Sequence, residues 1–289
     1  MASENRNYPL IKTMKFYLET KDHTLTGESF RLLHDPVLDM LVTEPQPENL
    51  GKYYESEDYI SHTDSKKSLV DRIYQTVKGY NLKSKLTLID SYASAEKTLL
   101  DVGAGTGDFL ALAGKYGWDV AGIEPNELAR LKAREKGVVL LEDINSLPAG
   151  QKFDVITLWH VLEHLPNLDE QISKLVGLLS DSGTLIVAVP NFKSYDAAHY
   201  KQYWAAFDVP RHLWHFSRNS VQRIFGNHGM KVVNIKPMMF DAFYVSLLSE
   251  KYKTGKQNFV KALWSGFKSN LFAFKSKEYS SLIYIIKRR

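Results

Sequence analysis

Three side chains with the types and spacing of a metal site occur within five residues of this sequence. His160 and His164 are four positions apart, and Glu163 directly precedes the second histidine. Residues four apart lie on the same face of a helix, and H-x-x-E-H is the inverted form of the zinc-protease signature. Pro166 follows two residues after His164 and would interrupt the helix that such a site needs. We therefore expect no metal here.

A second group of residues that could do chemistry lies earlier in the chain. The segment 101–108, DVGAGTGD, has three glycines at alternate positions, and Glu124 follows 21 positions after Gly103. Closely spaced glycines let the backbone turn tightly and approach a ligand. An acid at the end of the next strand can accept hydrogen bonds from ribose hydroxyls. We expect the ligand to carry a nucleoside.

Two features of this loop distinguish between nucleoside cofactors. The dinucleotide motif G-x-G-x-x-G would need glycine where the chain has Asp108. Asp101 and Asp108 also place two carboxylates near a helix N-terminus, where a pyrophosphate would otherwise bind. The same carboxylates are favourable beside an ammonium and a sulfonium. The loop favours S-adenosylmethionine as cofactor, and an NAD-dependent oxidoreductase is the alternative.

Alternating strand and helix patterns must position both groups. Apolar runs predict buried strands over 98–103, 118–124, 138–142, 153–159, 183–190, 230–238 and 280–288. Helical patterns occupy 107–116, 125–137, 168–180 and 217–229. The alternation predicts an α/β fold with a seven-stranded, doubly wound, Rossmann-like sheet. Ligands of such sheets bind at the carboxyl ends of the strands, where both groups lie.

Composition bounds the class of protein. The chain has 289 residues, no cysteine and a net charge of +4. The lack of cysteine excludes disulfides and thiolate metal sites and favours the cytoplasm. No apolar run is long enough for a signal peptide or a membrane span, so we expect neither. Residues 251–289 hold ten basic residues and one acid, a net +9, so residues 1–250 carry −5.

Five blocks of sequence point to a known family: LLDVGAGTGDF, GIEPN, LEDINSLP, FDVITLWHVLEHLPN and GTLIVAVPN. In their order and spacing the chain resembles class I S-adenosylmethionine-dependent methyltransferases, and in particular the bacterial group similar to ubiquinone-biosynthesis O-methyltransferases. The resemblance covers roughly residues 95–238 and includes FDVPRHLWHFS at 207–217. It implies a methyltransferase that acts on a small molecule by O-methylation. A cofactor-binding protein that has lost catalysis is a further alternative.

The resemblance also implies roles for individual residues. The implied cofactor-binding residues are Asp101, Gly103, Gly105, Glu124, Pro125, Asp143, Ile144, Trp159 and His160. The first three would face the methionine part, and Glu124 would bind the ribose hydroxyls. Asp143 would accept the adenine amino group, with Pro125 and Ile144 beside the ring. Trp159 and His160 would form the floor under the sulfonium.

Catalysis at a hydroxyl acceptor would also need a base. An imidazole is the usual proton acceptor near neutral pH. The candidates are His160, His164, His212 and His215. We favour His164 and then His212, because the loop after the fifth strand usually borders the acceptor pocket in this fold.

The remaining regions are expected to flank this domain. We expect an N-terminal appendage and lid segment over 1–65 and the Rossmann-like domain over 66–289. Relatives often carry paired cysteines before a segment like GKYYESEDYISH (51–62), but this chain has LLHDPVLDM there, so zinc is not expected. We expect lid or substrate roles for Tyr53, Tyr54, Tyr59, His62 and Arg211.

A basic aromatic insertion is expected at about 240–278. Within it, aromatic residues alternate with lysines over FVKALWSGFKSNLFAFK (259–275). A basic aromatic helix can lie at a lipid surface, but we favour a packed helix with solvated lysines. No nucleic-acid reader module is present, so the expected partner is a small-molecule acceptor. The sequence leaves the oligomeric state open.

Overall fold

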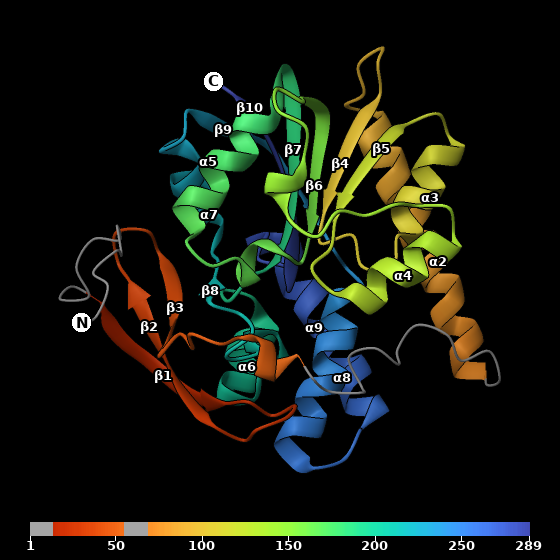
Figure 1. Cartoon of the computed structure of the whole chain (residues 1–289). Coiled ribbons are helices and arrows are strands. Elements are labelled where there is room, and N and C mark those ends of the chain that lie inside the picture. Colours follow the sequence, from red (N-terminus) through yellow and green to blue (C-terminus); the bar gives the residue numbers. More distant parts are fainter. Residues whose placement is uncertain (1–13, 55–68) are drawn as a thin grey trace.

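The computed structural model describes residues 14–54 and 69–289, which form two sheets with helices around them (Figure 1). The larger sheet has six strands in the order β5-β4-β6-β7-β10-β9. These strands are β4 (Thr98–Val102), β5 (Asp119–Ile123), β6 (Phe153–Trp159), β7 (Leu179–Pro190), β9 (Met230–Pro237) and β10 (Ser281–Arg288). Neighbours among β5, β4, β6 and β7 are parallel, whereas β10 is antiparallel to both β7 and β9.

Helices cover both faces of this sheet, because its central strands are apolar on both sides. One face packs against α5 (Leu168–Leu178) and α7 (Arg218–Gly226). The other packs against α2 (Leu69–Asp90), α3 (Asp108–Lys115) and α4 (Glu127–Glu135). The prediction of a doubly wound α/β sheet is therefore confirmed.

One predicted strand, over residues 138–142, does not form. Only Leu141 joins the sheet, through a single parallel bridge to Ile123. Its N–H donates to the Gly122 carbonyl (2.9 Å), and its own carbonyl accepts from the Glu124 N–H (2.8 Å). The chain turns away directly afterwards, because Asp143 begins the 3-10 turn η3 (Ile144–Ser146). The sheet thus has six strands, and the prediction of seven was wrong at this edge.

A smaller antiparallel sheet combines distant parts of the chain. Its order is β1 (Lys15–Lys21), β2 (Ser29–Asp35), β3 (Met40–Glu44) and β8 (Trp214–His215). Leu41 pairs with His215 across the β3–β8 contact. A third core cluster joins Phe30 and Leu32 of this sheet to Trp204 and Phe207. The segment around the turns η5 (Lys201–Tyr203) and η6 (Ala205–Phe207) therefore forms the support for the N-terminal strands.

The segment between β9 and β10 forms two packed helices, α8 (Asp241–Thr254) and α9 (Phe259–Ser276). The short helix α6 (Tyr195–Tyr200) packs against both of them. In Figure 1 the pair lies in blue beneath the larger sheet. No helix in the described ranges is both long and apolar enough to cross a bilayer.

Candidate cofactor and catalytic site

The loop between β4 and α3 (residues 103–107, the glycine loop) is built from left-handed glycines. Gly103 has φ 72° and Gly105 has φ 54°, values that other residues adopt only with strain. A Cβ at Gly103 would lie 2.3 Å from Val161 Cγ2, so this glycine lets the loop after β6 pack closely. A Cβ at Gly105 would meet no atom within 4 Å. The space beside Gly105 is open, as a ligand site requires.

Glu124 lies beside this loop, directly after β5. Its Oε2 accepts a hydrogen bond from the Gly105 N–H (2.8 Å), and its Oε1 accepts from the Asn126 N–H (2.9 Å). The carboxylate therefore sets the position of the loop and stays partly exposed beside it. This location is compatible with the predicted bond to ribose.

Asp101 is buried at the same edge, and the partly buried Lys85 is close enough to interact with its charge. Thr157 donates a hydrogen bond to Asp101 Oδ1 (2.5 Å), and burial raises the pKa of Asp101 to about 6. Lys85, from α2, lies with its ammonium 4.3 Å from the centre of the Trp159 ring. Burial lowers the pKa of Lys85, and the Coulombic attraction of Asp101 opposes this shift. A cation is favourable beside Asp101, as the ammonium of the predicted cofactor would be.

Our sequence analysis missed Lys85, although a signal was present. Leu82, Leu86 and Ile89 of α2 are wholly or partly buried and recur at helical spacing. Lys85 falls within this stripe, three positions after Leu82. A lysine on the buried stripe of a helix indicates a site that needs a positive charge.

Asp108 occupies the N-terminus of α3, where a pyrophosphate would bind in a dinucleotide fold. Thr106 Oγ1 donates to Asp108 Oδ2 (2.9 Å), and the Lys136 ammonium lies 2.9 Å from Oδ1. The helix N-terminus therefore already faces an anion of the protein itself. This geometry disfavours the dinucleotide alternative.

The residues predicted around adenine lie along the edge beyond β5. The bridge between Ile123 and Leu141 brings Pro125 and Asp143 to the same edge of the sheet. Asp143 is exposed, and its Oδ1 accepts from the Asn145 N–H (2.6 Å). Pro125 is exposed, whereas Ile144 packs against the core. The structure thus gathers these three predicted residues, and their contact with adenine remains a prediction.

Trp159 and His160 end β6 and border the glycine loop. The indole Nε1 of Trp159 is buried and has no hydrogen-bond partner among the described residues. His160 has φ 57°, which turns the chain sharply out of the strand. Its Nε2 lies 3.1 Å from Asp241 Oδ2, and its Nδ1 lies 3.5 Å from Glu163 Oε1. Burial opposes its protonation, but the bonds to Asp241 and then Glu163 outweigh this and raise its pKa to about 10.

The metal-like motif of the sequence does not fold as a long helix. Only the 3-10 turn η4 (Leu162–His164) forms, so His160 and His164 do not share a helix face. Two residues of the motif do converge with one from elsewhere: Glu163, His164 and His212 offer ligand atoms within 4.8 Å of one another. We call these three residues the histidine cluster. His212 comes from a distant loop, and its ring centre lies 4.5 Å from that of His164.

Both histidines of the cluster are held in one tautomer by carbonyls. His164 Nδ1–H donates to the Arg211 carbonyl (3.0 Å), and His212 Nδ1–H donates to the Ala206 carbonyl (2.9 Å). Because Nδ1 of His164 carries the proton, its Nε2 is left with a lone pair. Burial, and then the neighbouring His212, lower the pKa of His164 to about 4. His164 is therefore neutral at physiological pH, and its environment makes it a weaker base than a free imidazole.

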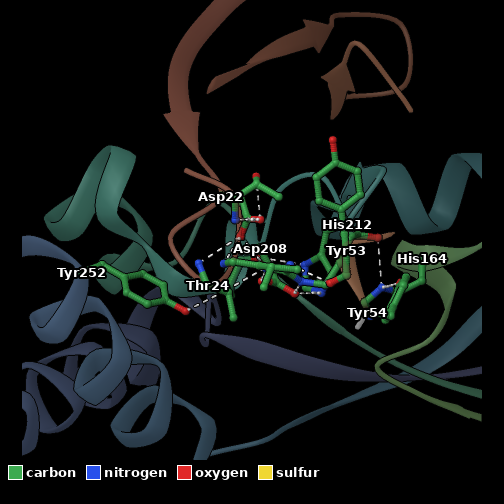
Figure 2. A network of polar contacts seen from close by, with 12 residues as sticks. Asp22, Thr24, Tyr53, Tyr54, His164, Asp208, His212 and Tyr252 are labelled. Atoms are coloured by element: carbon green, nitrogen blue, oxygen red, sulfur yellow. Dashed lines mark hydrogen bonds and ion pairs between the residues drawn. The ribbon is translucent and has the colours of Figure 1, made fainter. Parts of the chain in front are cut away.

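Arg211 connects the histidine cluster to the N-terminal sheet, and Figure 2 labels its partners Asp22, Thr24, Tyr53 and Asp208. Its guanidinium donates to Asp208 Oδ1 (2.5 Å), Asp22 Oδ1 (3.1 Å), Thr24 Oγ1 (2.8 Å) and the Tyr53 carbonyl (3.1 Å). The side chain is only 2% exposed. These contacts make Arg211 a structural tie, and its predicted substrate role finds no support in them.

The predicted lid residues fall into three groups. Tyr53 is buried beside Phe30, and its hydroxyl donates to Glu28 Oε2 (2.5 Å), so it packs in the N-terminal core and not over the cofactor edge. Tyr54 does reach the site, because its hydroxyl lies 3.0 Å from His164 Nδ1 (Figure 2). Tyr59 and His62 lie outside the described residues.

The site residues fit S-adenosylmethionine on three structural grounds. Within the described part of the chain, Gly105 borders open space and the Trp159 indole N–H has no partner, and the Asp101 carboxyl is buried. Comparison with known proteins agrees. The profile of the methyltransferase domain family matches residues 59–235, more than half of the chain, which therefore belongs to this family.

Individual sequence relatives support the same family. A ubiquinone biosynthesis O-methyltransferase of Histophilus somni (strain 2336) is 37% identical over 116 residues, 35% of this chain and 48% of that one. Its namesake from Azoarcus sp. (strain BH72) is 26% identical over 173 residues, 54% of this chain and 74% of that one. The chain spans about half the length of most of these curated relatives.

The fold comparison extends further along the chain. The crystal structure of magnesium protoporphyrin IX methyltransferase (ChlM) from Synechocystis PCC 6803, with bound SAH, superposes with a TM-score of 0.55. The sequence identity is 17%, and the match covers 82% of this chain and 97% of that one. At this identity the comparison establishes the fold.

Proposed function

We propose that this protein is an S-adenosylmethionine-dependent methyltransferase that methylates an oxygen of a small-molecule acceptor. The observation that supports it most is the buried Asp101 carboxyl beside an open glycine loop and Glu124, within a methyltransferase domain. We propose the cytoplasm as its location, because the chain has no cysteine. The NAD-dependent alternative gains no support from the family match.

Several residues would hold the cofactor, which supplies an electrophilic methyl group on sulfur when bound. Asp101 would attract the ammonium of the cofactor. Lys85 would compete little for Asp101, because burial lowers the pKa of the Lys85 ammonium. Glu124 would turn its oxygens to the ribose hydroxyls. Trp159 would donate its free indole N–H, and His160 would hold the floor through its ion pairs with Asp241 and Glu163.

Proton removal is the remaining chemical task at a hydroxyl acceptor. We assign it to His164, because its Nε2 has a lone pair, and the adjacent His212 is the second candidate. The Arg211 carbonyl fixes the tautomer of His164. Tyr54, at 3.0 Å from the same ring, would link acceptor binding to the segment that contains Tyr59 and His62.

Two experiments test this function. Calorimetry should detect binding of S-adenosylhomocysteine and none of NADH; the opposite result would support the oxidoreductase alternative. Turnover should then be measured on a panel of phenols, amines and carbon acids with the labelled cofactor. Methylation confined to the phenols supports the proposal. Binding without turnover on any class would support a cofactor-binding protein that has lost catalysis.

A further inference from the structure

Helix α9 has its large apolar residues on the outside. The residues that it buries are small: Ala262, Ser265, Gly266, Ser269 and Ala273. Its exposed residues are large and apolar: Phe259, Val260, Leu263, Trp264, Phe267, Leu271, Phe272 and Phe274. Trp264 is 58% exposed and Phe274 is 71% exposed. The helix is packed against α8, as we favoured, but its large aromatic residues lie on the exposed side.

Close packing with α8 explains the small inner face. A Cβ at Gly266 would lie 2.9 Å from the Phe243 Cα, so the backbones of α8 and α9 are closer than any residue with a Cβ would permit. The buried Ser269 hydroxyl donates to Asp196 Oδ1 (2.6 Å), which fixes the rotation of the helix. Because this inner face is firmly bound, the outer apolar face is a permanent surface and not a displaced core.

Lysines surround this outer face and are not neutralised. Lys253, Lys261, Lys268 and Lys275 form no ion pair within the described ranges of the chain. Lys268 lies 5.3 Å from the Trp264 ring centre. Three of the four also line a pocket of about 300 Å³ between α6, α8 and α9, together with Glu250, His199 and Trp264. Three lysines against one carboxylate leave the pocket with an excess of positive charge, and its volume can receive an anionic group.

The apolar face continues toward the cofactor edge. Asn270 of α9 donates to the Met239 carbonyl (2.9 Å), and Met239 and Phe240 are both about half exposed. Phe240 packs edge-on against the exposed Tyr80 at 5.9 Å. The next residue, Asp241, holds His160. A partner bound to α9 would thus lie near the end of β6 that carries His160.

We propose that α9 and the Met239–Phe240 loop dock on an anionic phospholipid surface, with the lysine pocket receiving a headgroup phosphate. Large apolar side chains would enter the acyl boundary while lysines contact the headgroups. Charge favours lipid over a second copy, because two such faces would bring lysines against lysines, and residues 251–289 carry +9. This docking is independent of the proposed methyl transfer, since it needs neither cofactor nor acceptor.

Co-sedimentation of the full chain with vesicles tests the charge component. We expect binding to vesicles that contain phosphatidylserine, weaker binding to phosphatidylcholine alone, and release at high salt. Changing Lys261, Lys268 and Lys275 to Gln should weaken binding roughly 100-fold, from about fivefold per lysine. The control changes exposed Lys15, Lys21 and Lys231 to Gln, with the same loss of charge elsewhere. Equal effects of the two triple variants would overturn the proposal.

The apolar component has its own test. Trp264→Ser with Phe267→Ser should abolish sedimentation with vesicles, whereas Tyr116→Ser with Val139→Ser, at exposed sites elsewhere, should not. Light scattering should give the same molecular mass for the wild type and for the variant with Trp264→Ser and Phe267→Ser. A dimer that this pair dissociates would assign the face to a second copy. Displacement of the vesicles by duplex DNA at equal affinity would assign it to nucleic acid, and either result contradicts lipid docking.

Discussion

Single residues decide which cofactor this site accepts. Asp101 and Asp108 are both carboxylates near one helix N-terminus, yet their environments differ. Asp108 is paired with Lys136, whereas Asp101 is buried with a raised pKa. Only Asp101 therefore gains from a ligand cation, which explains why an ammonium fits and a pyrophosphate does not.

Glu124 provides the clearest prediction at this scale. Glu124→Ala should weaken the binding of S-adenosylhomocysteine by roughly 1–3 kcal/mol, because charge-assisted hydrogen bonds to the ribose are lost. Calorimetry measures the change, and Glu127→Ala on the exposed start of α4 is the matched control. Unchanged affinity in the first variant would remove the ribose assignment.

His164 should make the folded state sensitive to acid. Its pKa is lowered to about 4 in the folded state, so the unfolded state binds a proton first as the pH falls. The stability associated with neutral His164 is present above about pH 6.5 and is lost between there and pH 4. In urea unfolding, the free energy of unfolding of the wild type should fall by about 2–3 kcal/mol more than that of His164→Gln between pH 6.5 and pH 4. Parallel pH profiles would contradict this prediction.

At the scale of elements, the turn after β6 brings Glu163 and His164 beside His212 of a distant loop. These three potential ligands converge, but Glu163 already faces His160, whose raised pKa keeps it positively charged. The carboxylate is thus neutralised by the protein, which disfavours a dication beside it.

The corresponding prediction concerns metal content. Protein purified without chelator, and protein incubated with zinc and then desalted, should contain no stoichiometric metal by elemental analysis. One equivalent of metal that disappears in His212→Ala would show that the histidine cluster is a metal site after all.

At the scale of the whole molecule, the buried Arg211 connects the N-terminal sheet to the histidine cluster. Arg211→Met should lower the free energy of unfolding by about 3–5 kcal/mol, because Asp22 and Asp208 lose their countercharge. Arg31→Met removes an exposed pair with Glu44 and should cost less than about 1 kcal/mol. Urea denaturation compares the two variants. Similar losses in the free energy of unfolding would show that Arg211 does not hold the N-terminal sheet in place.

Local rules explain what the sequence by itself determined. Ser217 caps α7 with a capping box, the glycine loop follows β4, and β6 spans the predicted 153–159. Such features depend on the period of apolar residues and on the backbone freedom of glycine. Both are local properties, because they involve only residues that are close in sequence. The sheet class, the methyltransferase family and the edge at which the site lies were therefore predictable.

The tertiary structure alone decided which side chains meet. Arg211 contacts Asp22, 189 positions away, and His212 joins Glu163 only because its loop returns beneath β6. The composition of α9 could not reveal that its small residues face inward, since a helical period shows two faces but not which one is buried. That choice depends on how closely α8 approaches, and the backbone contact at Gly266 determines it.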